Sequence, residues 1–101
     1  MVDNKKIQIG GYIVPIKKIK SVANKYKKEL ALQINKVISG KKIDEKFEYF
    51  NLTQLSRYFL ICDKIIAGKI PEATKVYDEM DTSWRDDFDG ELSDILSQIY
   101  Y

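Results

Sequence analysis

The chain has 101 residues, of which 45% are hydrophobic and 32% are charged, and its formal net charge is +2. This length and composition indicate one globular domain and argue against a disordered chain. One cysteine and no histidine exclude an internal disulfide and remove the usual general base and the commonest zinc ligand. No apolar run reaches the roughly 18 residues of a membrane span, and no signal peptide is visible. We therefore expect a cytoplasmic protein with no cofactor, no bound metal and no membrane partner.

Residues 5–16 predict a β-hairpin. Ile7 and Ile9 alternate with polar neighbours, and Gly10-Gly11 is a typical two-residue turn between paired strands. An isolated hairpin is only marginally stable, so we expect this one to pack on helices.

Residues 17–39 predict a long basic helix, because apolar side chains recur there at intervals of three and four residues. The apolar stripe comprises Ile19, Val22, Tyr26, Leu30, Ile34 and Val37. Gly40 is a plausible stop, since glycine commonly follows the last helical residue in a left-handed conformation.

A second helix is predicted over residues 52–67. Asn51 can cap its N-terminus, and Gln54 three residues later completes a capping-box pattern. The stripe of this helix includes Cys62, which we expect to be a buried, unreactive side chain because no histidine can activate it.

Two more helices are predicted over residues 71–80 and 83–100. Pro71 suits the first turn of the former, and Ser83 can cap the latter. Gly90 lies within the last helix and weakens it, so a break there is an alternative. The predicted fold is α+β and mostly α: one domain over residues 1–101, with a short N-terminal hairpin packed on about four helices.

The two halves of the chain carry opposite charge. Residues 1–43 hold eleven lysines and two carboxylates, whereas residues 44–101 hold thirteen carboxylates and six basic residues. Such asymmetry is typical of a protein with a charged partner, or of one whose halves neutralise each other.

The lysines of the first predicted helix are candidates for contacts with phosphate groups. The candidate nucleic-acid-binding residues are Lys17, Lys20, Lys27 and Lys28. Against this interpretation, the segment contains no arginine, which is favoured for bidentate recognition of phosphates and bases. A solvated helix face is the simpler interpretation.

The second charged feature is acidic: eight carboxylates fall within seventeen residues. They are Asp78, Glu79, Asp81, Asp86, Asp87, Asp89, Glu91 and Asp94. One interpretation is a surface that imitates nucleic-acid phosphates and covers a basic cleft of another protein, for example a nuclease. The alternatives are helix N-terminal stabilisation with solubility, and pairing with the lysine face inside the fold.

Residues 58–96 are similar in pattern to helical immunity proteins of the colicin-D and contact-dependent-inhibition type. The shared elements are Ala67-Gly68-Lys69-Ile70 after an apolar helix, Trp84, and Asp89-Gly90-Glu91-Leu92. This resemblance implies an acidic surface that neutralises a nuclease. The Ile-Gly-Gly-Tyr segment before a basic helix is instead similar to the start of phage tail-assembly chaperones. These partial similarities assign the chain to neither family.

The function expected from the sequence is that of a small non-enzymatic protein that inhibits or modulates another macromolecule through its acidic surface. Immunity, antitoxin and phage anti-defence inhibitors are of this kind. Two alternatives stay open: a nucleic-acid-binding accessory protein that uses the lysine-rich segment 17–42, and a phage assembly chaperone or structural protein.

Overall fold

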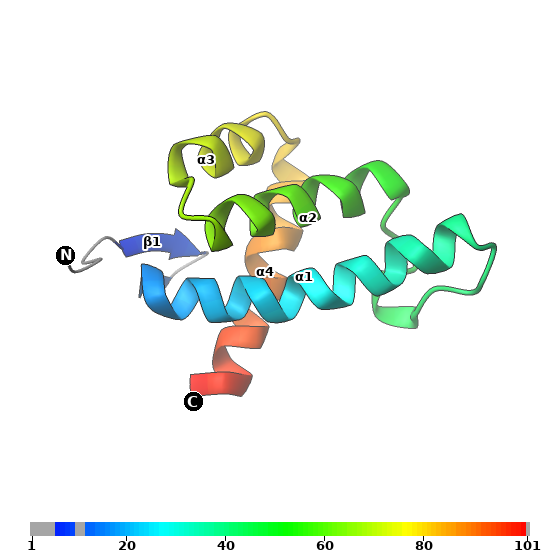
Figure 1. Cartoon of the computed structure of the whole chain (residues 1–101), viewed down its shortest axis with the longest axis horizontal. Coiled ribbons are helices and arrows are strands. Elements are labelled where there is room, and N and C mark those ends of the chain that lie inside the picture. The colour runs from blue at the N-terminus through cyan, green and yellow to red at the C-terminus, as the bar shows by residue number, and fades with distance from the viewer. Residues whose placement is uncertain (1–5, 10–11, 101) are drawn as a thin grey trace.

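Four helices make up most of the computed structural model, which describes residues 6–9 and 12–100 (Figure 1). The helices are α1 (Ile16–Ile38), α2 (Leu52–Ile66), α3 (Ile70–Asp78) and α4 (Thr82–Tyr100), and a 3-10 turn, η1 (Glu45–Phe47), lies between α1 and α2. α1 and α2 pack along each other, α3 lies on α2, and α4 crosses α1 at a steep angle. No helix in the described part of the chain is both long and apolar enough to cross a membrane.

The predicted α+β class is wrong, because this is a helical fold. The helices have 23, 15, 9 and 19 residues, against two paired segments of four residues each, β1 (Lys6–Ile9) and β2 (Tyr12–Pro15). No β layer contributes to the described core, whose buried side chains come from the helices, from Phe47 and from Met80 in the turn before α4. The predicted turn at Gly10-Gly11 lies outside the described residues. The alternating pattern misled the prediction because a few extended residues do not supply a sheet face.

Both ends of α2 follow from local sequence signals. The Asn51 side chain accepts a hydrogen bond from the Gln54 backbone N–H at 2.8 Å, as an N-cap residue does. The Gln54 side-chain amide donates to the Tyr58 hydroxyl at 2.8 Å, and the hydrogen bonds of the described residues do not include the predicted return bond from the Asn51 N–H to Gln54. At the other end, Gly68 has φ +79° and the Lys69 N–H bonds to the Lys64 carbonyl, which is a Schellman ending.

Replacing glycine by alanine should have opposite effects on stability at Gly40 and at Gly90. Gly40 ends α1 with φ +70°, whereas Gly90 lies exposed within α4, where an added Cβ meets nothing within 4 Å. We expect Gly90→Ala to raise the free energy of unfolding by about 0.5–1 kcal/mol. Gly40→Ala should lower it by about 1 kcal/mol, because alanine is strained at positive φ. Urea titration of both variants tests this, and a destabilised Gly90→Ala would contradict it.

The apolar stripe of α1 is only partly buried. Ile19, Val22, Tyr26 and Leu30 are fully buried, whereas Val37 is 36% exposed. The C-terminal end of α1 extends past α2, so its last turn has no helix to pack against (Figure 1). Helical periodicity identifies an apolar face, but it does not show where the packing partner ends.

The start and the continuity of α4 also differ from the sequence-based expectation. The helix begins at Thr82, and the Asp81 carbonyl accepts the first helical hydrogen bond, from the Arg85 N–H at 3.0 Å. Asp81, and not the predicted Ser83, is therefore the N-cap residue of α4. α4 continues through Gly90 without a break, since Phe88, Leu92, Ile95 and Leu96 are all buried on its inner face. Packing of this face outweighs the weak helix preference of one glycine.

Aromatic side chains form the centre of the core. The Tyr58 ring lies 5.0 Å from that of Phe88, 5.6 Å from Phe50 and 6.3 Å from Tyr26, measured between centroids. The Tyr58 hydroxyl donates to the Trp84 carbonyl at 2.6 Å. This single side chain therefore joins α2 both to the loop before it and to α4.

The loop after α1 is fixed by a buried amide. Gln33 is 1% exposed, and its side chain donates to the Asp44 carboxylate at 2.7 Å and accepts from the Asp44 backbone N–H at 2.8 Å. Lys36 also contacts this carboxylate, at 2.7 Å. The hydrogen bonds from Lys36 and Gln33 lower the pKa of Asp44. The loop thereby places Lys46 and Phe47 against the helices.

Candidate protein-binding surface

Five of the eight acidic residues are exposed where α3 turns into α4. We call this set the acidic corner: Asp78, Glu79, Asp81, Asp86 and Asp87. Within the described part of the chain, no lysine or arginine forms an ion pair with any of them. All five carboxylates therefore face solvent within a stretch of ten residues.

The other three acidic residues are divided between the two flanks of α4. Asp89 accepts a hydrogen bond from the Tyr77 hydroxyl of α3 at 2.7 Å. Glu91 lies on the opposite flank and forms an ion pair with Lys46 at 2.9 Å. Asp94 is exposed three residues further along that flank. The predicted eight-residue surface is therefore not one patch, since Asp89 and Glu91 make contacts that hold α4 in place.

Glu91 belongs to a small polar cluster between α1, η1 and α4. Lys46 lies 2.9 Å from Glu91 and 3.9 Å from Glu29, so one ammonium group bridges two carboxylates. The hydroxyl of Tyr26 is buried with no hydrogen-bond partner among the described residues. Burial and the negative charge of Glu91 raise the pKa of Tyr26 above its usual range. The cluster joins the basic and acidic halves of the chain inside the fold.

The four candidate lysines face two different environments. Lys17 and Lys28 are exposed, whereas Lys27 is half-buried and forms an ion pair with Asp63 of α2 at 2.8 Å. Lys20 is half-buried as well, and its ammonium lies 3.9 Å from the position of a Cβ built on Gly68. The side of α1 that carries Lys20 and Lys27 is therefore turned toward α2, and the predicted phosphate-binding face is smaller than the sequence suggests.

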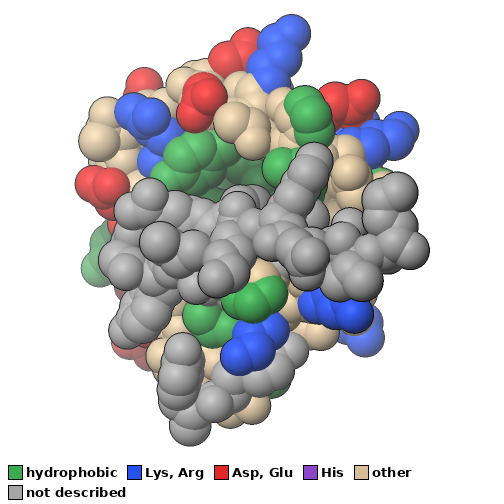
Figure 2. Space-filling model, turned by 90° about the vertical axis from the view of Figure 1, so that its left-hand side faces the viewer, with side chains coloured by type: hydrophobic (Ala, Val, Ile, Leu, Met, Phe, Trp, Pro, Cys, Tyr) green, Lys and Arg blue, Asp and Glu red, His purple; other side chains and the backbone are tan. Residues whose placement is uncertain are grey.

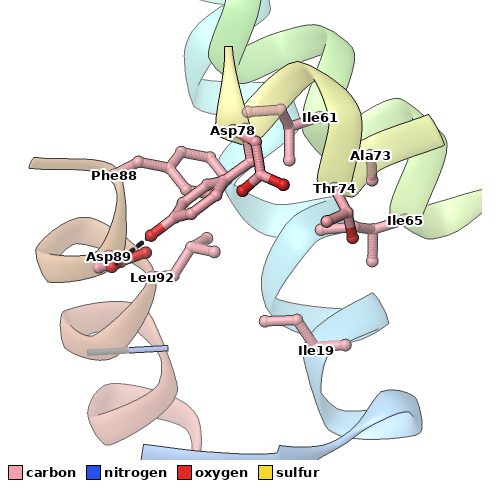
Figure 3. Close-up of a pocket in the computed structure, with 10 residues that line it drawn as sticks. Ile19, Ile61, Ile65, Ala73, Thr74, Asp78, Phe88, Asp89 and Leu92 are labelled. Atoms are coloured by element: carbon pink, nitrogen blue, oxygen red, sulfur yellow. Dashed lines mark hydrogen bonds between the residues drawn. The ribbon is translucent and has the colours of Figure 1, made fainter. Parts of the chain in front are cut away.

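A cavity of about 220 Å³ opens beside the acidic corner, and all four helices line it. Figure 3 shows Ile19, Ile61, Ile65 and Leu92 pointing into one space, with the Asp78 carboxylate directed toward it from α3. On the face shown in Figure 2, hydrophobic side chains are visible among acidic and basic ones. The lining thus combines apolar side chains from all four helices with the Asp78 carboxylate.

A second hollow, of about 230 Å³, lies between α2 and the turn before α4. Its lining brings Arg57 and Trp84 together with Glu79 and Asp81 of the acidic corner. Trp84 is half-buried and Arg57 is exposed. Aromatic residues and arginines are enriched at protein interfaces, so the acidic corner adjoins side chains of the kinds that interfaces use.

Cys62 is buried and is a poor candidate for a nucleophile. Desolvation raises the pKa of its thiol to about 12, although the charge of Lys27 acts in the opposite direction. We expect the folded protein to resist a thiol reagent at pH 8 and to react only after denaturation. A time course with Ellman's reagent, with and without urea, measures this. Rapid labelling of the folded protein would contradict the assignment.

Sequence reasoning missed three contributors to these sites. Lys46 was not singled out because its role depends on Glu29 and Glu91, which are distant in the sequence. Arg57 was likewise unassigned, and the cavity results from the packing of four helices.

No group of three or more Cys, Asp or Glu side chains in the described ranges is arranged to hold a metal ion.

Comparison of the chain with protein-family models, with curated proteins and with solved structures gives no match.

Proposed function

We propose that the protein acts by binding a basic surface of another protein through the acidic corner, and that it thereby inhibits or modulates this partner. Immunity, antitoxin and phage anti-defence roles all suit a small inhibitor of this kind. A nuclease is a suitable partner, since its substrate-binding cleft is basic and exposed carboxylates can imitate phosphate groups.

The observation that carries the proposal is the exposure of five carboxylates within ten residues. Each of them would gain from a basic partner, because none forms an ion pair with a described lysine or arginine. Opposite charges across an interface speed association and select the partner. The neighbouring Trp84 and Arg57 supply the kinds of side chain that contribute most to binding energy.

Charge reversal at the acidic corner tests this proposal. The variant Asp81→Lys/Asp86→Lys/Asp87→Lys avoids Asp89 and Glu91, whose contacts hold α4. Immobilised protein is exposed to lysate of its own host, with and without nuclease treatment, and the retained proteins are quantified by mass spectrometry. We expect a basic protein to be retained by the wild type and retention to fall on the order of tenfold or more in the variant.

A matched variant with the opposite change is the control. Lys17→Glu/Lys25→Glu/Lys28→Glu alters three exposed residues of α1 and should retain the basic partner. Far-ultraviolet circular dichroism and melting temperature establish that both variants fold. If the acidic-corner variant retains the same partner as the wild type, the proposal is wrong. If nuclease removes every partner and only the α1 variant loses binding, the function lies with nucleic acid and the lysines.

A further inference from the structure

We propose that the cavity beside the acidic corner receives one apolar side chain of the partner protein, and that a lysine or arginine adjacent to this side chain contacts Asp78 at the rim. This inference rests on the proposed function, because it names what the partner presents to the acidic surface. The ligand class is therefore an apolar group next to a cation.

The size of the cavity favours a single side chain. At about 220 Å³ it is smaller than the roughly 300–1,000 Å³ of pockets for cofactors and drug-sized ligands. A cavity of about 150 Å³ lined by Leu, Ile and Phe already admits benzene. A phenyl or branched aliphatic group therefore fits, and a nucleotide does not.

The lining separates the apolar and charged parts of the occupant. Ile19, Ile65 and Leu92 form the hydrocarbon part of the lining, and Thr74, Tyr77 and Asp89 add polar atoms to it. Asp78 is exposed, lines the same cavity, and has no ion-pair partner among the described residues. The Tyr77 hydroxyl and the Asp89 carboxylate, which also line the cavity, are joined by a hydrogen bond of 2.7 Å, drawn as a dashed line in Figure 3.

Charge complementarity decides between possible occupants. A carboxylate or phosphate group would meet Asp78 and the neighbouring acidic corner and be repelled. An apolar group with no charge would fill the interior but gain nothing at the rim. An apolar group with an adjacent cation satisfies both parts, and it is also what a basic partner surface can present.

Three near-isosteric probes test the inference without the partner: benzylammonium, benzyl alcohol and benzoate. Each is titrated at pH 7 into the full-length protein with ¹³C-labelled Ile and Leu methyl groups. We expect the methyl signals of Ile19, Ile61, Ile65 and Leu92 to shift. Benzylammonium should bind about two- to fivefold more tightly than benzyl alcohol, and benzoate most weakly. The inference is wrong if these methyl groups do not respond, or if the ammonium and the alcohol bind equally.

Variants separate the roles of cavity and rim. Asp78→Asn should reduce the preference for benzylammonium over benzyl alcohol, whereas Asp94→Asn, on the opposite flank of α4 and outside the lining, should preserve it. Ala73→Leu should fill the cavity and abolish binding of all probes. Should this buried change unfold the protein, Thr74→Leu, at an exposed position of the lining, serves instead. Binding by the filled variants that matches the wild type would overturn the inference.

The outcome is distinguishable from that of the function proposal. Probe binding is tested by changes in the cavity and at Asp78, whereas partner retention is tested by changes at Asp81, Asp86 and Asp87. Once a partner is identified, Ala73→Leu or Thr74→Leu should reduce its affinity at least tenfold with the acidic corner intact. Unchanged affinity would show that the partner does not use the cavity.

Discussion

Replacing Tyr58 by alanine is expected to lower the free energy of unfolding by about 3–5 kcal/mol, the range for truncating a large buried aromatic residue. Tyr58 is fully buried, and its ring contacts Tyr26, Phe50 and Phe88. Since small domains are stable by only about 5–15 kcal/mol, the variant should be largely unfolded under mild denaturing conditions. Urea titration followed by circular dichroism measures the change.

Two conservative variants separate the ring from the hydroxyl. Tyr58→Phe leaves the Trp84 carbonyl and the Gln54 amide without their partner, so we expect a loss of about 1–3 kcal/mol. Tyr26 is equally buried, but its hydroxyl has no partner among the described residues. Tyr26→Phe should therefore be neutral or stabilising. Equal losses in both variants would show that the hydrogen bonds of Tyr58 contribute nothing specific.

The second large effect is expected at Lys46. Lys46→Met removes the cation between two carboxylates, of which Glu91 has a side chain only 15% exposed. An unpaired charge at such a position is costly, and we expect a loss of about 1–3 kcal/mol at pH 7. The control is Lys64→Met, because Lys64 pairs with Glu72, whose side chain is 54% exposed. That change should cost less than about 1 kcal/mol. A cost as large as that of Lys46→Met would contradict the idea that the low exposure of Glu91 makes the loss of Lys46 costly.

The pH dependence of this effect has a definite sign. Desolvation lowers the pKa of Lys46, but its contact with Glu91 and the charges of Glu29 and Asp94 outweigh this and raise it. A raised pKa in the folded state stabilises the fold below the pKa of an unfolded-chain lysine, about 10.4. The difference between wild type and Lys46→Met should thus be constant near neutral pH and shrink as the pH rises through the folded-state value.

Local sequence signals determine the helices of this protein. Intervals of three and four between apolar residues mark all four, Asn51 marks the start of α2, and the glycines at positions 40 and 68 mark two helix ends. These signals work because capping and left-handed turns involve residues only a few positions apart. The charge division between the two halves is likewise a property of the sequence alone.

Only the tertiary structure decides which charged residues are available to a partner. Asp89 and Glu91 belong to the acidic stretch, yet Tyr77 and Lys46 engage them within the fold, and Asp63 engages Lys27. The cavity, the exposure of Val37 and the helical rather than α+β class depend in the same way on how the helices pack. Periodicity specifies a face of a helix, but burial and pairing are set by contacts between residues that are far apart in the chain.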